Sequence, residues 1–137
     1  DTATETLQTF PVLKELRPHL DEIQYPGLIE TLKREGATLI AAFDTQNQCL
    51  GVGIFRIHTL TFLNGEREMY VDDLVVSESA RSQGIGKLLL DWLKAEAQRI
   101  GCVGLSLDSA NYRVDAHRFY KREGLDNMGG HFRVAFV

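Results

Sequence analysis

The stretch that decides the fold is EMYVDDLVVSESARSQGIGKLLLDWLKAEAQRIG, residues 68–101. Glu68 to Val76 is predicted to be a strand. Arg81 to Gly86 is a polar, glycine-bearing loop. Apolar residues then recur at helical spacing from Ile85 to Ile100 and stop at Gly101, which predicts an amphipathic helix.

The residues before this stretch predict two helices and a hairpin. In the first, apolar residues at helical spacing end before Pro18; they are Leu7, Phe10, Leu13 and Leu16. In the second, they end before Gly36; they are Tyr25, Leu28, Ile29 and Leu32. Two strands follow around a turn at 44–48, over Thr38 to Phe43 and Leu50 to Leu60. Asn64-Gly65 is a strong turn signal that leads into the strand at Glu68.

The residues after Gly101 predict a strand, a helix and a strand. These are Val103 to Leu107, Asp115 to Glu123 closed by Gly124, and His131 to Val137. The expected order is therefore ααβββαβαβ. Antiparallel hairpins that feed a β-α-β crossover predict an α/β (α+β) fold, with a mixed, mostly antiparallel central sheet flanked by helices. We expect one domain over residues 1–137, because this length is that of one ordinary domain.

Composition narrows the class of protein. Hydrophobic residues make up 44% of the chain and charged residues 25%, as in globular proteins. The net charge is −4 and the basic residues are dispersed, so we expect no nucleic-acid partner. A mildly acidic chain suits a small cationic substrate, although net charge is a weak guide to substrate.

Cysteine usage and hydropathy predict where the protein works. Cys49 and Cys102 stand alone, without the spacing of a zinc site or a disulfide framework, so no metal is expected. No apolar run approaches the length of a membrane span, and the first ten residues lack the features of a secretion signal. We expect a cytoplasmic protein without a membrane partner. The chain does not begin with Met, so a short preceding segment is expected.

The loop between the strand and the helix has the chemistry of an anion site. Glycine allows close backbone approach, and the first N–H groups of a helix have no intrahelical partner. A P-loop is excluded by Arg81 and Leu88, and a dinucleotide fingerprint by Leu89. The simpler interpretation, that Gly84 and Gly86 only cap the helix, stays open on these residues alone.

Two motifs together resemble the GCN5-related N-acetyltransferases. The first is Arg81-x-x-Gly84-x-Gly86 after Leu74-Val75-Val76; the second is Ala116-His-Arg-Phe-Tyr-Lys-Arg-Glu-Gly124-Leu. The resemblance implies acetyl-CoA as the acetyl donor and coenzyme A as the product. It also implies that backbone groups of Leu74, Val75 and Val76 hold the pantetheine arm. The pyrophosphate is expected on the loop formed by Arg81, Ser82, Gln83, Gly84, Ile85, Gly86 and Lys87.

Tyr120 is the predicted general acid. Acyl transfer from a thioester releases a thiolate, and a phenol beside the sulfur can protonate it. The family commonly uses the tyrosine of this motif in that way. The alternative is a core tyrosine whose hydroxyl is satisfied locally.

A carboxylate on the third strand is the candidate general base. Tyr70-Val-Asp72-Asp73 resembles a segment of polyamine acetyltransferases in which the residue matching Asp72 is proposed to act through water. Side chains alternate along a strand, so Asp72 and Asp73 are expected on opposite faces. A carboxylate that only solvates the strand or binds a substrate cation is the alternative.

The resemblance leaves the acceptor undefined. The family often has Asn seven residues before the tyrosine; Arg113 stands there, and Asn111, two residues earlier, is carried over as a cofactor contact. Acceptor pockets in this family come from the first helices and the loops, here residues 17–36 and 60–68. The segment Asp115-Ala-His-Arg-Phe-Tyr120, with His131-Phe-Arg, also resembles aminoalkylphosphonate acetyltransferases.

The expected function is therefore acetyl transfer to a primary amine, with a small molecule as the partner. Direct attack in a ternary complex is expected, because no cysteine lies on the third strand or the Tyr120 helix. A non-catalytic acyl-CoA-binding regulatory module and a protein lysine or N-terminal acetyltransferase remain alternatives. A homodimer is left open as the assembly.

Overall fold

The computed structural model describes residues 3–136. Its helices and strands follow the order α1 (Ala3–Leu16), α2 (Tyr25–Arg34), β1 (Thr38–Phe43), β2 (Cys49–Thr59), β3 (Arg67–Val76), α3 (Ile85–Arg99), β4 (Gly104–Leu107) and α4 (Val114–Arg122). Two short 3₁₀ turns, Thr61–Leu63 and Glu78–Ala80, flank β3. From β1 to α4, each boundary lies within one residue of the sequence prediction.

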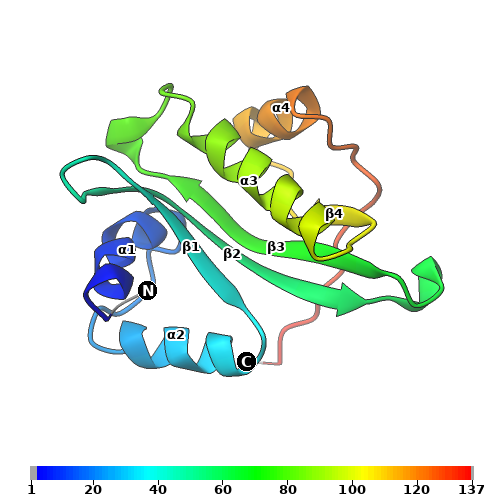
Figure 1. Ribbon diagram of the computed structural model, residues 1–137, viewed down its shortest axis with the longest axis horizontal. Helices are drawn as coiled ribbons and strands as arrows, with labels where there is room; N and C mark the ends of the chain where they lie inside the picture. The colour runs from blue at the N-terminus through cyan, green and yellow to red at the C-terminus, as the bar shows by residue number, and fades with distance from the viewer. Residues whose placement is uncertain (1–2, 137) are drawn as a thin grey trace.

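The sheet is mixed, as predicted. Its strand order is β1-β2-β3-β4; β1 and β3 pair antiparallel with β2, and β4 pairs parallel with β3. Helix α3 makes the crossover between the two parallel strands and lies against one face of the sheet, with α4 beside it (Figure 1). Helices α1 and α2 cover part of the opposite face, which gives a layer of helices on each side of the sheet.

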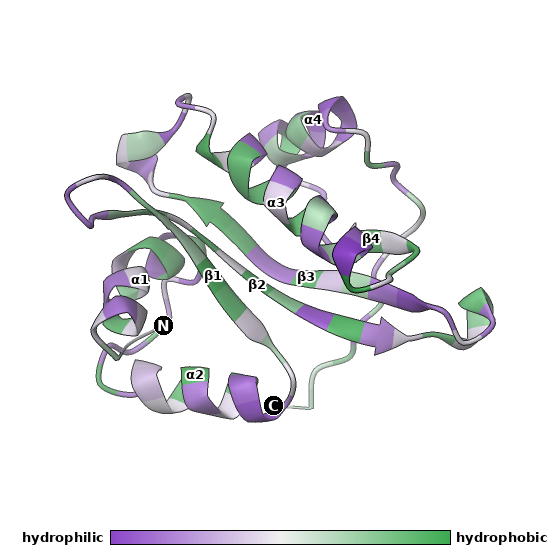
Figure 2. Ribbon diagram, in the orientation of Figure 1, coloured by the Kyte–Doolittle hydropathy of each residue, from purple (hydrophilic) through white to green (hydrophobic). Residues whose placement is uncertain are grey.

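Two hydrophobic clusters hold these layers together. The first joins α1 and α2 to the sheet through Phe10, Leu13, Val52 and Ile54, among others. The second joins α3 to the sheet through Phe55, Met69, Val71, Leu93 and Ala97. Hydrophobic and hydrophilic residues alternate along α3 in Figure 2, as expected of a helix with one buried face.

The buried face of α1 differs from the predicted stripe. Phe10 and Leu13 are buried, but Leu7 is 46% exposed, and Thr6 and Thr9 are buried in its place. The Thr9 hydroxyl lies 2.6 Å from the hydroxyl of Tyr25 in α2. This hydrogen bond satisfies a polar group that would otherwise be costly to bury, so the helix can turn its threonines inward.

A β-bulge in β3 overturns the expectation that Asp72 and Asp73 face opposite sides. Ile54 of β2 pairs with Asp73 and Phe55 pairs with Val71, so Asp72 is the extra residue. One extra residue reverses the alternation of side chains beyond it. Both carboxylates consequently face the side of α1, where they line one small pocket.

The strand predicted over His131 to Val137 is not formed by residues 131–136. Among the described residues, no backbone hydrogen bond joins this segment to the sheet, and Phe132 is 96% exposed. An alternating pattern forms a strand only where the segment pairs with another strand, and these residues pair with neither outer strand, β1 or β4. Instead the segment runs behind the sheet towards α2 in the view of Figure 1. Val137 itself lies outside the described residues.

Over residues 3–136, the helices are all too short or too polar to cross a lipid bilayer.

The α3 face of the sheet should depend on Leu93, which is 0% exposed. We predict that Leu93→Ala lowers the free energy of unfolding by about 2–5 kcal/mol, because it leaves a cavity under the helix. Leu88→Ala is the matched control: Leu88 is 59% exposed on the same helix, so its loss should cost less than about 1 kcal/mol. Urea denaturation measures both, and equal losses would contradict this account of the core.

Candidate active site

The loop between β3 and α3 presents unpaired backbone donors. Ser82 and Gly84 have positive φ angles of 67° and 80°, which bend the chain sharply before the helix. Within residues 3–136, no N–H group from Ser82 to Lys87 donates a hydrogen bond. The first to do so is that of Leu88, to the Gly84 carbonyl at 3.0 Å. A run of free amides at a helix N-terminus attracts anions.

Gly86 brings three elements close together at this point. A Cβ atom at Gly86 would lie 3.4 Å from the Phe119 ring of α4 and 3.6 Å from the Val76 side chain. The start of α3 therefore packs tightly against the end of β3 and against α4. A larger residue would push α4 away from the loop.

The charged side chains of the loop already have partners. Lys87 pairs with Asp91 at 3.1 Å and with Glu123 at 3.0 Å, and these carboxylates raise the pKa of Lys87. Arg81 lies 3.9 Å from Glu15 of α1. The Lys87–Glu123 pair ties α3 to α4, so the backbone amides are the groups that remain for an anion.

Strands β3 and β4 separate beside this loop. Their pairing runs from Glu68 and Gly104 to Val71 and Leu107 and ends there. Beyond Val71, β3 pairs only with β2, so the side of Leu74, Val75 and Val76 that faces β4 has no neighbouring strand. An extended ligand can add to such an edge through backbone hydrogen bonds.

Tyr120 lies at this opening. It comes from α4 and lines a pocket of about 30 Å³, room for one or two water molecules, with Asp72, Asp73 and Arg113 among the other walls. Its hydroxyl makes no hydrogen bond to any other described residue. Burial raises the pKa of Tyr120, and Arg113 partly opposes this effect. The phenol is therefore protonated at neutral pH and has a proton to give.

The two aspartates of the bulge have different partners. Arg56 Nε donates to Oδ2 of Asp72 at 2.8 Å, whereas Oδ1 of Asp72 is buried without a hydrogen-bond partner in residues 3–136. Arg17 Nε donates to Asp73 at 2.9 Å. Burial nevertheless raises the pKa of Asp73, because desolvation outweighs the Arg17 charge. Both Arg17 contacts go to Oδ1 of Asp73, so what distinguishes Asp72 is that its unpaired oxygen is buried.

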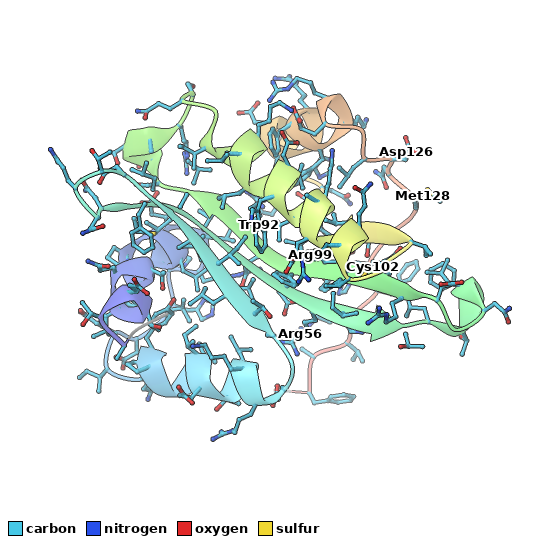
Figure 3. All side chains as sticks on the ribbon, in the orientation of Figure 1. Arg56, Trp92, Arg99, Cys102, Asp126 and Met128 are labelled. Atoms are coloured by element: carbon cyan, nitrogen blue, oxygen red, sulfur yellow. The ribbon has the colours of Figure 1, made fainter. Side chains whose placement is uncertain are left out.

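A larger cavity of about 490 Å³ adjoins this pocket on the same face of the sheet. Its walls come from β2, β3, β4 and the segment after α4: Arg56, His58, Leu60, Glu68, Tyr70, Ser106, Asp108 and His131. Asp108 lines both spaces. In Figure 3, Arg56 lies on β2, and Asp126 and Met128 mark the segment that leads from α4 towards His131.

Most walls of this cavity were missed by the sequence analysis, which looked to residues 17–36 and 60–68. Leu60 and Glu68 fall in those ranges, and Arg17 lines the smaller pocket. The signal for Arg56 and His58 was their alternation with apolar neighbours on a central strand. Asn111 is exposed in the β4–α4 loop and lines neither space, whereas Arg113 lines the smaller one.

The two cysteines lie away from both cavities. Cys49 is buried and Cys102 is partly buried, and neither lines the two cavities. Over residues 3–136, no group of three His, Cys, Asp or Glu side chains is arranged to hold a metal ion.

Comparison with solved structures defines the class of fold. The chain superposes on a transcriptional regulator from Bacillus halodurans C-125 with a TM-score of 0.89, at 21% identity, over 99% of this chain and 96% of that one. Glucosamine-6-phosphate N-acetyltransferase from Arabidopsis thaliana gives a TM-score of 0.82, at 17% identity, over 100% and 95%. At these identities the likeness shows that this chain shares the fold of those proteins.

The sequence identifies the family. Residues 3–125 match the acetyltransferase (GNAT) family, to which this chain belongs. It is 32% identical to the uncharacterised N-acetyltransferase YhdJ of Bacillus subtilis (strain 168), over 91% of this chain and 84% of that protein. It is also 43% identical to the aminoalkylphosphonate N-acetyltransferase of Salmonella typhimurium, over 46% of this chain and 40% of that protein.

Proposed function

We infer that this protein transfers the acetyl group of acetyl-CoA to a primary amine of a small molecule, by direct attack in a ternary complex. The observation that carries this proposal is the Tyr120 hydroxyl. It is unpaired and protonated, and it lies where β3 and β4 separate, on the helix that packs against the anion-binding loop.

The residues fit acetyl-CoA as donor substrate. The free amides from Ser82 to Lys87 suit the pyrophosphate. The open edge of β3 from Leu74 to Val76 suits the pantetheine arm, which carries amide groups of its own. When bound, acetyl-CoA supplies a thioester whose carbonyl carbon is the electrophile.

The protein's own groups move the protons. The acceptor ammonium must lose a proton before its nitrogen can form the C–N bond, and the free Oδ1 of Asp72 can accept it through a water molecule in the small pocket. Cleavage of the C–S bond leaves a thiolate, which takes the Tyr120 proton, and the second proton that the nitrogen loses on becoming an amide restores the phenol. Arg56 holds Asp72 in place through Oδ2 and leaves Oδ1 free.

A small-molecule acceptor agrees with the position of the larger cavity. It adjoins the pocket at Tyr120, and His131, from the segment after α4, forms part of its wall. The aminoalkylphosphonate relative acts on a small amine by its name. The cytoplasmic location and the assembly state stay predictions.

Acetyl-CoA should raise the melting temperature of the protein, by linkage worth about 2.7 kcal/mol at a hundred times its dissociation constant. Dephospho-CoA should stabilise as well, because it keeps the pyrophosphate. Gly84→Val should abolish both effects, since φ at Gly84 is +80° and a branched residue would move the loop amides. Gly65→Val is the matched control: φ there is +86°, in the β2–β3 turn. If acetyl-CoA stabilised Gly84→Val as much as Gly65→Val, the assignment of the pyrophosphate to this loop would be wrong.

Tyr120→Phe should lower kcat by about a hundredfold to ten-thousandfold, since it removes the proton donor and little volume. Calorimetry should find acetyl-CoA affinity almost unchanged. Tyr112→Phe is the control, because Tyr112 is 84% exposed and lies in the loop just before α4. Turnover of Tyr120→Phe within about twofold of wild type would rule out the general acid. Binding of acetyl-CoA without acetylation of any amine, peptide or protein would favour the binding-module alternative.

Asp72→Asn should reduce kcat/KM most at pH values below the pKa of the acceptor amine. The defect should shrink as pH rises, because more of the amine is then already deprotonated. The measurement is a pH profile of acetyl transfer for wild type, Asp72→Asn and the exposed-site control Asp126→Asn. A defect that is constant with pH would assign Asp72 to positioning the acceptor instead.

A further inference from the structure

One cation at the small pocket has no partner. Arg113 immediately precedes α4 and lines the pocket together with Tyr120. Its side chain makes no hydrogen bond or ion pair with any other described residue. In contrast, Arg17, the other arginine of the pocket wall, binds Asp73 at 2.9 Å. Arg113 therefore brings to this pocket a positive charge that the protein itself does not match.

Arg113 and Tyr120 lie on the same face of α4. They are seven positions apart, which is about two helical turns and roughly 10 Å along the helix axis. Side chains of a helix lean towards its N-terminus, so the Tyr120 ring leans towards Arg113. The long side chain of Arg113 can span the remaining distance. Its backbone is held at the start of the helix, because its carbonyl accepts a hydrogen bond from the His117 N–H at 3.1 Å.

The carboxylates that face Tyr120 have donors of their own. They come from β3 and from the residue after β4, and Arg17 faces the pocket from the residue after α1. Burial raises the pKa of Tyr120, and Arg113 is the charged group that lowers it. Asp72 is bound by Arg56, Asp73 by Arg17, and Asp108 by the Tyr70 hydroxyl, with His131 3.1 Å from Asp108.

The proposed acetyl transfer forms an anion at Tyr120. The phenol gives its proton to the coenzyme A thiolate and remains a phenolate until the second proton lost by the nitrogen restores it. The small pocket has room for one or two water molecules, so little solvent can stabilise this phenolate. A cation that is already in place stabilises charge that develops during a reaction without reorganisation of the site.

We propose that Arg113 is the electrostatic partner of Tyr120: its guanidinium stabilises the phenolate that forms when Tyr120 protonates the thiolate. This rests on the proposed function, in which Tyr120 is the general acid. Arg113 acts through Tyr120 and is therefore a positioning residue for the proton transfer. The motif that this chain resembles often has Asn at this position, and a neutral amide cannot supply the charge.

The first experiment measures the ionisation of Tyr120 without turnover. Replacing Tyr120 with fluorotyrosine gives a more acidic phenol, whose titration fluorine NMR follows in the folded protein. Arg113→Gln should move the midpoint to higher pH by about one unit or more, because loss of a nearby cation disfavours the phenolate. Arg113→Lys keeps the charge and should titrate near wild type. An unchanged midpoint in Arg113→Gln would overturn the proposal.

Arg118→Gln is the matched control for this titration. The Arg118 side chain also belongs to α4, but it is 76% exposed and lines neither cavity. Its loss should leave the midpoint where it is in wild type, because solvent screens an exposed charge.

Kinetics then separate a role through Tyr120 from a role in folding or binding. Arg113→Gln should lower kcat by about tenfold to a hundredfold and leave acetyl-CoA affinity unchanged in calorimetry, and Arg113→Lys should recover most of the loss. In a Tyr120→Phe background, Arg113→Gln should cause no further loss, because the two residues act as one unit. Additive losses would contradict the pairing of Arg113 with Tyr120.

The outcomes distinguish this proposal from the proposed function. If Tyr120→Phe loses turnover but Arg113→Gln changes neither the titration nor kcat, the acetyltransferase stands and the role of Arg113 is wrong. If Tyr120→Phe keeps wild-type turnover, the general acid is wrong, and the role of Arg113 is wrong with it. If no amine is acetylated, the proposed function fails, whereas the titration alone still decides whether Arg113 stabilises the phenolate.

Discussion

The constraint on which the site depends is the end of pairing between β3 and β4 after Val71 and Leu107. Two parallel strands that separate leave backbone groups on the inner edges without partners, and buried groups of this kind need a ligand or water. The residues beyond Val71 gain their hydrogen bonds on one side only, from β2. The opening between β3 and β4 is therefore produced by the end of their hydrogen bonding. Helix α4 places Tyr120 at this opening.

The bulge at Asp72 begins where this separation begins. It turns Asp73 and Val75 to the same face as Asp72, so Val75 can join the core under α1 while two carboxylates gather at the opening. Two like charges this close are costly unless each is compensated. Arg56 from β2 and Arg17 after α1 supply that compensation.

These ion pairs divide the face of the sheet into two parts. At the bulge, Asp72 is paired with Arg56 and Asp73 with Arg17. In the larger cavity, Glu68 accepts a hydrogen bond from the Ser106 hydroxyl, and Asp108 accepts one from the Tyr70 hydroxyl and lies 3.1 Å from His131.

The sequence by itself determined the elements between Thr38 and Arg122 and the acetyltransferase family of the chain. Helical and strand spacing predicted every boundary from Thr38 to Arg122 within one residue, because the apolar periods there are long and bounded by glycine or turn residues. It also identified the loop at 81–87 and Tyr120 as candidates. Each belongs to a short continuous motif, which can be recognised without knowing the fold. Only the tertiary structure decided which faces those residues share. The bulge at Asp72 reversed the alternation of side chains along β3, and the Thr9–Tyr25 hydrogen bond accompanies burial of the threonines of α1. Residues 131–136 did not pair with either outer strand of the sheet. The cavity that joins Tyr70, Asp108 and His131 likewise depends on contacts between segments distant in the chain, which no local pattern encodes.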